Sequence, residues 1–173
     1  EITLGDWSSD VCSSDLMADS FGLAYYKAEE AAPPALPLEG TVLMTVAERD
    51  RAGLAPVARA FHELGFKILA TEGTHRFLTE RGIPSEPIRK LHEGRPHLVD
   101  AIMNREIALV INTPIGKRSQ QDDSYIRKSA IKYKVPYITT LAAAQAAARG
   151  IAAVRKGRGG VKSLQEYHRA LAR

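Results

Sequence analysis

The stretch ILATEGTHRFLTERGI, residues 68–83, decides the fold because it joins a strand directly to a helix. The apolar run Ile68-Leu69-Ala70 predicts a buried strand, and the pattern over 74–81 predicts a helix that ends at Gly82. Two threonines and a glycine stand at the junction, where a plain connection needs only a turn residue and a cap. The stretch therefore indicates an α/β fold with unexplained polar groups at a strand end.

Strand-like and helix-like segments alternate along the chain from residue 41. Strands are predicted at 41–46, 66–70, 84–88, 107–112 and 137–140, and helices at 56–64, 74–81, 96–104, 122–134 and 141–149. The last of these helices is expected to stop at Gly150, and Ser163 with Glu166 has capping-box spacing for a final helix. Alternation of this kind predicts a three-layer α/β/α fold with a mostly parallel five-stranded sheet.

Polar residues follow the carboxyl ends of these strands, the edge at which open α/β sheets bind ligands. Hydroxyls and the backbone N–H groups beside glycines donate to phosphate oxygens, and helix N-termini add partial positive charge. The candidate residues are Arg51, Thr71, Gly73, Thr74, Lys90, Asn112, Thr113, Gly116 and Lys117. We therefore predict a phosphate-binding site at this edge. The alternative for Thr71 and Thr74 is a strand end and a helix cap.

Composition limits the class of protein. The chain has 173 residues, of which 45% are hydrophobic and 25% charged, as in soluble globular domains. No apolar run approaches the ~20 residues of a membrane span, and the single cysteine, Cys12, suits a reducing cytoplasm. We expect a cytoplasmic protein with no membrane partner. The net charge of +4 suits a phosphate-bearing ligand, and a nucleic-acid-binding module is the weaker alternative.

Several familiar motifs are absent from the sequence. There is no Walker phosphate loop and no G-x-G-x-x-G. His92 and His97 stand five residues apart, whereas a zinc-binding H-E-x-x-H pair needs a spacing of four. No metal site is therefore predicted, and a turn at Gly94-Arg95-Pro96 is expected to lead into the next helix.

The chain divides into three parts by composition. Residues 1–16 are polar, without a period of 2 or 3.6, and we interpret them as a non-native or disordered tail. Residues 17–39 combine a short helical pattern with a linker rich in proline, which blocks helix. Residues 40–173 are predicted to form the α/β domain.

Four segments together resemble one known family. ATEGT, KLHEGRPH, INTPIGKRSQQDDSYIRKSAI and VPYITTLAAAQAAARGI, in that order, resemble the C-terminal regulatory domain of the carbamoyl-phosphate synthase large chain. The resemblance covers about residues 40–168, and it implies the methylglyoxal-synthase-like fold, which is Rossmann-like. Residues 17–39 resemble the end of the second synthetase unit of that enzyme, so the chain looks like a fragment of a longer polypeptide.

The resemblance implies a binding site for nucleotide effectors such as UMP or IMP. The phosphate would lie near Arg51, Thr71, Gly73, Thr74 and Lys90. Asn112 and the loop after it, including Thr113 and Gly116, would contact the rest of the nucleotide. Tyr137 and Thr139 would face ornithine. Some relatives have lysine where this chain has Arg51, which keeps the charge and changes the hydrogen-bond geometry.

Full-length relatives make carbamoyl phosphate from bicarbonate, ammonia drawn from glutamine, and ATP, for arginine and pyrimidine synthesis. ATP and Mg or Mn belong to synthetase units that this chain lacks, so the resemblance implies no catalytic residue and no cofactor here. The implied partners are the rest of the large chain and the glutaminase small chain, and a homo-oligomer is left open. We expect the isolated chain to have no synthetase activity.

The alternative function is that of methylglyoxal synthase, a lyase that shares the fold. That enzyme removes a proton from dihydroxyacetone phosphate with carboxylates at the strand ends. The corresponding turns here, Gly94-Arg95-Pro96 and Asn112-Thr113-Pro114, contain no carboxylate. The sequence therefore favours binding over catalysis.

Overall fold

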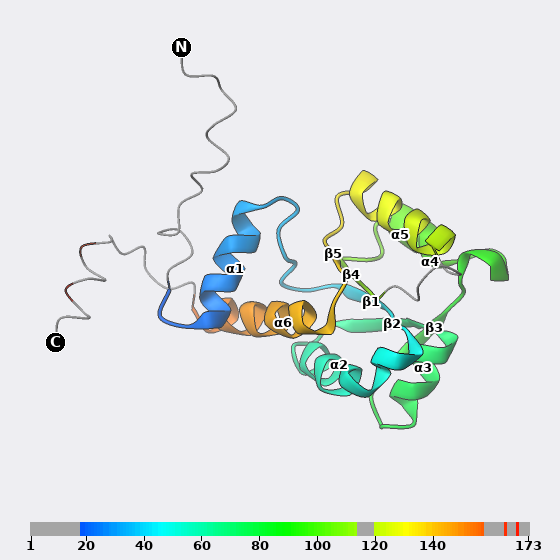
Figure 1. Ribbon diagram of the computed structural model, residues 1–173, viewed down its shortest axis with the longest axis horizontal. Helices are drawn as coiled ribbons and strands as arrows, with labels where there is room; N and C mark the ends of the chain where they lie inside the picture. The colour runs from blue at the N-terminus through cyan, green and yellow to red at the C-terminus, as the bar shows by residue number, and fades with distance from the viewer. Residues whose placement is uncertain (1–17, 114–119, 158–164, 166–168, 170–173) are drawn as a thin grey trace, which may run out of the picture.

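A single parallel sheet organises the molecule. The computed structural model describes residues 18–113, 120–157, 165 and 169 (Figure 1). The strands are β1 (Thr41–Thr45), β2 (Lys67–Thr71), β3 (Glu86–Ile88), β4 (Leu109–Asn112) and β5 (Tyr137–Ile138). Their order across the sheet is β3-β2-β1-β4-β5, and every pairing between neighbours is parallel. The predicted five-stranded α/β fold is confirmed.

Helices cover both faces of this sheet, as Figure 1 shows. One face carries α1 (Phe21–Ala31), α2 (Leu54–Glu63), α3 (Glu72–Thr79) and α6 (Leu141–Lys156), and the other carries α4 (Leu98–Met103) and α5 (Gln120–Lys132). Leu43 and Met44, neighbours on β1, are fully buried in different hydrophobic clusters because successive side chains of a strand point to opposite faces. Two short 3₁₀ helices, η2 (Glu48–Gly53) and η3 (Leu91–Glu93), follow β1 and β3.

Glycines end two of the helices as the sequence predicts. Gly65 follows α2 with φ +77°, and Gly82 follows α3 with φ +67°, a conformation that L side chains rarely adopt. These turns lead the chain back to β2 and toward β3. The boundaries of the predicted elements are otherwise shifted by a few residues, and η2 was not predicted.

The prediction that the last alanine-rich helix stops at Gly150 is wrong. Helix α6 continues through Gly150 to Lys156 and is capped at Gly157. A Cβ atom on Gly150 would lie 3.1 Å from the Gly22 carbonyl oxygen and 3.3 Å from the Tyr26 Cβ. The glycine therefore allows α1 to approach α6 closely instead of ending the helix. The further helix predicted from Ser163 and Glu166 lies outside the described residues.

The segment before β1 packs against the rest of the fold. Leu23 and Tyr26 of α1 and Leu36 of the linker are buried in the same cluster as α2 and α6. The Tyr26 hydroxyl donates to the Leu36 carbonyl at 3.4 Å, and the Arg155 guanidinium donates to the carbonyls of Leu38 and Leu64. The linker is thereby held against both α2 and α6. Within the described ranges, no helix has the length and apolar character that a membrane crossing requires.

Candidate functional site

Buried polar side chains gather at the carboxyl ends of β1, β2 and β4. Thr45 pairs with Asn112 in the β1–β4 register, and the Thr71 hydroxyl lies 3.4 Å from that of Thr45. Thr71, Asn112 and Thr113 are each at most 4% exposed. The parallel sheet thus brings together residues from three separate stretches of sequence, because the carboxyl ends of parallel strands share one edge.

The threonine hydroxyls hold the loop between β1 and η2. The Val46 N–H donates to the Thr74 hydroxyl at 3.2 Å, and the Ala47 N–H donates to the Thr113 hydroxyl at 2.8 Å. Thr74 is therefore not a helix cap. Thr71 occupies the N-cap position of α3, and its side chain makes no capping hydrogen bond. Thr74 therefore holds the loop that leads into η2, the short helix that contains Arg51.

Arg51 and Gly73 lie in direct contact. A Cβ atom on Gly73 would be 2.5 Å from Nη2 of Arg51, so the guanidinium occupies the space of the missing side chain at the first turn of α3. The Nε atom of Arg51 is buried and has no hydrogen-bond partner within the part of the chain that the structure describes. Buried N–H donors are normally paired, so this donor is an exception among the described residues.

Lys90 lies just beyond the end of β3. This strand is the neighbour of β2, which leads into α3 and Gly73. Ile88 pairs with Thr71 in the β2–β3 register, and Lys90 follows two residues later. The Lys90 N–H donates to Oε2 of Glu93 at 2.8 Å, which shapes the turn into η3. Lys90 therefore lies at the same edge of the sheet as Thr71.

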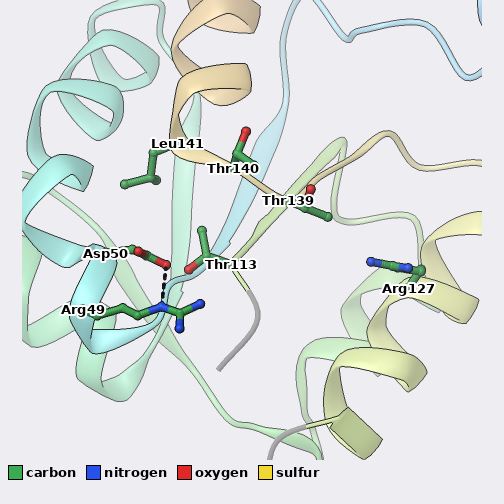
Figure 2. Close-up of a pocket in the computed structure, with 7 residues that line it drawn as sticks. All are labelled: Arg49, Asp50, Thr113, Arg127, Thr139, Thr140 and Leu141. Carbon is green, nitrogen blue, oxygen red and sulfur yellow. Dashed lines mark ion pairs between the residues drawn. The ribbon is translucent and has the colours of Figure 1, made fainter. Parts of the chain in front are cut away.

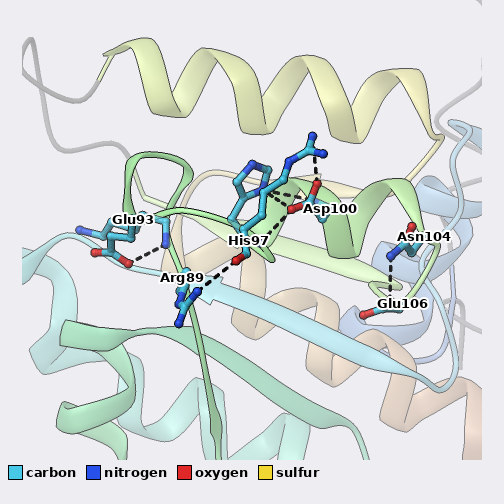
Figure 3. A network of polar contacts seen from close by, with 8 residues as sticks. Arg89, Glu93, His97, Asp100, Asn104 and Glu106 are labelled. Atoms are coloured by element: carbon cyan, nitrogen blue, oxygen red, sulfur yellow. Dashed lines mark hydrogen bonds and ion pairs between the residues drawn. The ribbon is translucent and has the colours of Figure 1, made fainter.

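The loop that follows Lys90 is held by its own polar contacts, drawn in Figure 3. Arg89 donates to the Arg95 carbonyl at 3.0 Å, and His97, 8% exposed, accepts from the Asp100 N–H and caps α4. His92 instead lies 3.1 Å from Asp122 in the first turn of α5. The two histidines therefore have separate partners on different helices.

Asn112 connects the end of β4 to α5 and β5. Its side-chain nitrogen donates to Oδ1 of Asp123 at 3.1 Å and to the Tyr137 hydroxyl at 2.6 Å. The Arg127 guanidinium carbon lies 5.5 Å from the centre of the Tyr137 ring, a cation–π distance. Tyr137 was expected to face ornithine. In the structure its hydroxyl accepts a hydrogen bond from Asn112, the residue that was expected to contact the nucleotide.

A cavity of about 480 Å³ opens beside Thr113 (Figure 2). Its lining contains two arginines, three threonines, one carboxylate and one leucine: Arg49, Arg127, Thr113, Thr139, Thr140, Asp50 and Leu141. Arg49 pairs with Asp50 at 3.7 Å, and the Thr140 hydroxyl accepts from the Ala143 N–H to cap α6. Thr139 lines this cavity, whereas Tyr137 lines a second one of about 500 Å³ beside Pro33 and Pro34.

The sequence analysis missed Arg49 and Arg127 as candidates. Arg49 stands in the polar run of residues 48–51 that follows the first predicted strand. Its position at a strand end was therefore a signal from which it could have been predicted. Arg127 lies inside a helix with no local signal, and only the packing of α5 brings it to both cavities. Gly116 and Lys117, also predicted for the site, lie outside the described residues.

Comparisons with known proteins agree with this architecture. Residues 53–139 match the family model described as MGS-like domain. The chain is 50% identical over 153 residues to the carbamoyl phosphate synthase large chain of Gemmatimonas aurantiaca. It is 48% identical over 151 residues to the carbamoyl phosphate synthase large chain, C-terminal section, of Methanopyrus kandleri. These matches cover 88% and 87% of this chain.

The chain spans only 14% of the first relative and 28% of the second. A solved structure, the crystal structure of ForH, is similar in fold alone, with a TM-score of 0.51 and 19% identity over 71% of this chain and 83% of that one. The matched family model covers half of the chain, from η2 to the strand end beside the cavity in Figure 2. This chain belongs to the MGS-like domain family.

Proposed function

We propose that this chain is the effector-binding domain of a carbamoyl phosphate synthase large chain, and that it binds a nucleoside monophosphate such as UMP or IMP. The observation that carries the proposal is the buried Nε of Arg51, which has no hydrogen-bond partner within the described residues and lies in the guanidinium that contacts Gly73. A buried donor without an acceptor costs about 1–3 kcal/mol, and more when charged, so a phosphate oxygen there would stabilise the domain.

The site offers binding groups of the kind that phosphate needs. Arg51 and Lys90 bring positive charge, and the N-terminus of α3 adds the partial charge of unpaired backbone N–H groups. We place the phosphate between these groups and the rest of the nucleotide toward Asn112 and Thr113. Ornithine, the second ligand that the resemblance implies, would contact Tyr137 or Thr139.

The same proposal extends to the longer protein. Synthesis of carbamoyl phosphate, with ATP, Mg or Mn and a glutaminase small chain, would belong to parts of the large chain outside this sequence, in a cytoplasmic enzyme of arginine and pyrimidine synthesis. The effector would bind one state of the domain better than another, and contacts with those parts would transmit the preference. Such coupling is typically ~1–3 kcal/mol.

Calorimetric titration with UMP, IMP, ornithine and inorganic phosphate tests the site. We expect Arg51→Ala and Lys90→Ala each to weaken nucleotide binding by about tenfold or more, or about 1.4 kcal/mol. Arg59→Ala is the matched control, because Arg59 is exposed on α2. Thermal unfolding of each variant verifies the fold. Unchanged nucleotide affinity in Arg51→Ala, or no binding by the unmodified chain, would contradict the proposal.

The lyase alternative has one observation in its favour, since the carboxylate of Asp50 lines the cavity in Figure 2. Proton abstraction from dihydroxyacetone phosphate needs a base of this kind. The Asp50 carboxylate is already engaged by the Arg49 guanidinium at 3.7 Å. Incubation with dihydroxyacetone phosphate and an assay for methylglyoxal decides the matter. If the unmodified chain forms methylglyoxal and Asp50→Asn does not, the chain has a catalytic role and the proposed binding role is wrong.

A further inference from the structure

A second cavity, of about 500 Å³, lies beside the start of β5, the edge strand of the sheet. Its walls come from the linker before β1, from the last turns of α5 and from the turn that leads into β5. The lining residues are Pro33, Pro34, Arg127, Ile131, Lys134, Val135 and Tyr137. Figure 1 shows the linker passing close to this turn. Small-molecule sites have volumes of roughly 300–1,000 Å³, so the cavity is large enough for a ligand.

This cavity differs in position from the candidate site. Lys134 precedes β5 and therefore lies toward the amino end of that strand. Thr71 and Asn112, in contrast, end β2 and β4 at the carboxyl edge of the parallel sheet. Arg127 lines both cavities, and its guanidinium carbon lies 5.5 Å from the centre of the Tyr137 ring. The second cavity is therefore a separate place on the molecule that has one arginine in common with the first.

The walls of this cavity are mainly apolar. Pro33 and Pro34 contribute proline rings, Ile131 and Val135 contribute branched aliphatic side chains, and Tyr137 contributes an aromatic ring. Both prolines are exposed, and Ile131 is 69% exposed, so much of this apolar surface is open to water. An apolar group of a ligand would remove that surface from water, which stabilises a complex.

Two cations complete the lining. Arg127 and Lys134 are both exposed, and no carboxylate belongs to the part of the lining that the structure describes. The side-chain ammonium of ornithine would therefore meet two like charges here. It is better suited to the cavity in Figure 2, where Asp50 supplies a carboxylate. The charge of the second cavity favours an anion.

We propose that this second cavity binds a small carboxylate that carries an aromatic or branched aliphatic group. The apolar group would lie against Ile131 and the Tyr137 ring, and the carboxylate would pair with Lys134 and Arg127. A guanidinium can hold both oxygens of a carboxylate, and hydrogen bonds between ionised groups are stronger than neutral ones. The inference goes beyond the proposed function and does not depend on it, because it concerns a different ligand at a different place.

Small ligands that differ in one group test the charge and the apolar part separately. 3-Phenylpropanoate carries a ring and a carboxylate, 3-phenylpropan-1-amine carries the same ring with a positive charge, and propanoate lacks the ring. Each is titrated into the unmodified chain and followed by NMR. We expect 3-phenylpropanoate to bind with a dissociation constant on the order of 1 mM, and the other two to bind at least about tenfold more weakly. The amide signals of Ile131, Val135 and Tyr137 should shift, and those of Thr71 and Gly73 should not.

Lys134→Gln removes the charge and keeps most of the side chain, so it should weaken the binding of 3-phenylpropanoate by about three- to tenfold. Lys128→Gln is the matched control, because Lys128 is exposed on α5 and does not line the cavity. It makes the same change in net charge and should leave the affinity unchanged. Ile131→Ala should also weaken binding, since it removes part of the apolar wall. Thermal unfolding verifies the fold of each variant.

The comparison of ligands on the unmodified chain can overturn the inference without any variant. It would do so if 3-phenylpropanoate showed no saturable binding, or if the amine bound equally well. Equal effects of Lys134→Gln and Lys128→Gln would also contradict it, because the anion would then respond only to net charge. Shifts confined to Thr71 and Gly73 would mean that the carboxylate binds at the candidate site instead. Titration with UMP tests the proposed function separately.

Discussion

The contact between Arg51 and Gly73 shows how a single missing side chain can shape a site. Gly73 was predicted to help bind a phosphate through the backbone N–H groups beside it. In the structure the space is filled by the Arg51 guanidinium, whose buried Nε lacks a partner within the described residues. Any side chain at position 73 would displace the cation that is the strongest candidate for binding a phosphate.

Gly73→Ala should therefore weaken anion binding without harming the fold. The new Cβ would lie 2.5 Å from Nη2 of Arg51, so the flexible guanidinium must move. We expect the affinity for UMP to fall by about three- to tenfold, while alanine inside α3 keeps or raises the stability of the helix. Calorimetry and thermal unfolding measure the two effects.

Thr79→Ala is the control for this variant, because Thr79 is exposed in α3 and its hydroxyl donates to the His75 carbonyl of the same helix. It should leave UMP affinity unchanged. An unaltered affinity in Gly73→Ala would mean that the position of Arg51 does not matter for binding.

Helices α1 and α6 pack through glycines at their point of contact. A Cβ atom on Gly22 would lie 2.7 Å from the Arg149 carbonyl oxygen, and one on Gly150 would lie 3.1 Å from the Gly22 carbonyl oxygen. Because neither glycine has a side chain, the backbones of α1 and α6 pack directly against each other at this point. This packing explains why α6 contains a glycine in its middle. Together with Arg155, this contact ties the segment before β1 to the rest of the fold.

Gly22→Ala should destabilise the chain, although alanine normally stabilises a helix by about 0.5–1 kcal/mol relative to glycine. The clash is with backbone, which cannot rotate away, so we expect a loss of about 1–3 kcal/mol in the free energy of unfolding. Gly150→Ala should cost less, since its contacts are longer. Urea denaturation measures both. A Gly22→Ala chain as stable as the original would show that α1 is not tightly packed.

The molecule as a whole is a sheet covered by helices on both faces, and β1 is the middle strand of that sheet. Leu43 and Met44 are both fully buried although they point in opposite directions. The site lies where this rigid layer ends, so its side chains are carried by strands and not by loops alone. The spacing of Thr71, Thr45 and Asn112 is therefore set by the pairing of the strands that end with them.

Leu43→Ala and Met44→Ala should each lower the free energy of unfolding by about 2–5 kcal/mol, because each leaves a cavity in a packed cluster. Ile131→Ala is the control, since Ile131 is 69% exposed and its truncation should change stability by about 0.5 kcal/mol or less. Chemical denaturation compares the three variants. A small effect at Leu43 alone would show that α4 and α5 do not cover their face of the sheet.

Much of the site was predictable because strand ends can be located by pattern. The apolar run at 107–112 and the junction at 70–74 indicate where β4 and β2 end, so Asn112, Thr113, Thr71 and Gly73 could be placed at one edge. Arg127 could not, because it reaches the cavities only through the packing of α5. The bond between Asn112 and Tyr137 joins residues 25 positions apart, which no local pattern specifies.

The sequence by itself determined the alternation of strands and helices, the parallel sheet and the edge at which polar groups meet, because these follow from local periodicity and from the geometry of parallel strands. Only the tertiary structure decided the roles of individual residues. Thr74 binds the loop after β1, Gly150 allows α1 to pack closely, Gly73 makes room for Arg51, and Tyr137 accepts a hydrogen bond from Asn112. Each role depends on a neighbour from a distant part of the chain, and such neighbours are set by packing rather than by local sequence.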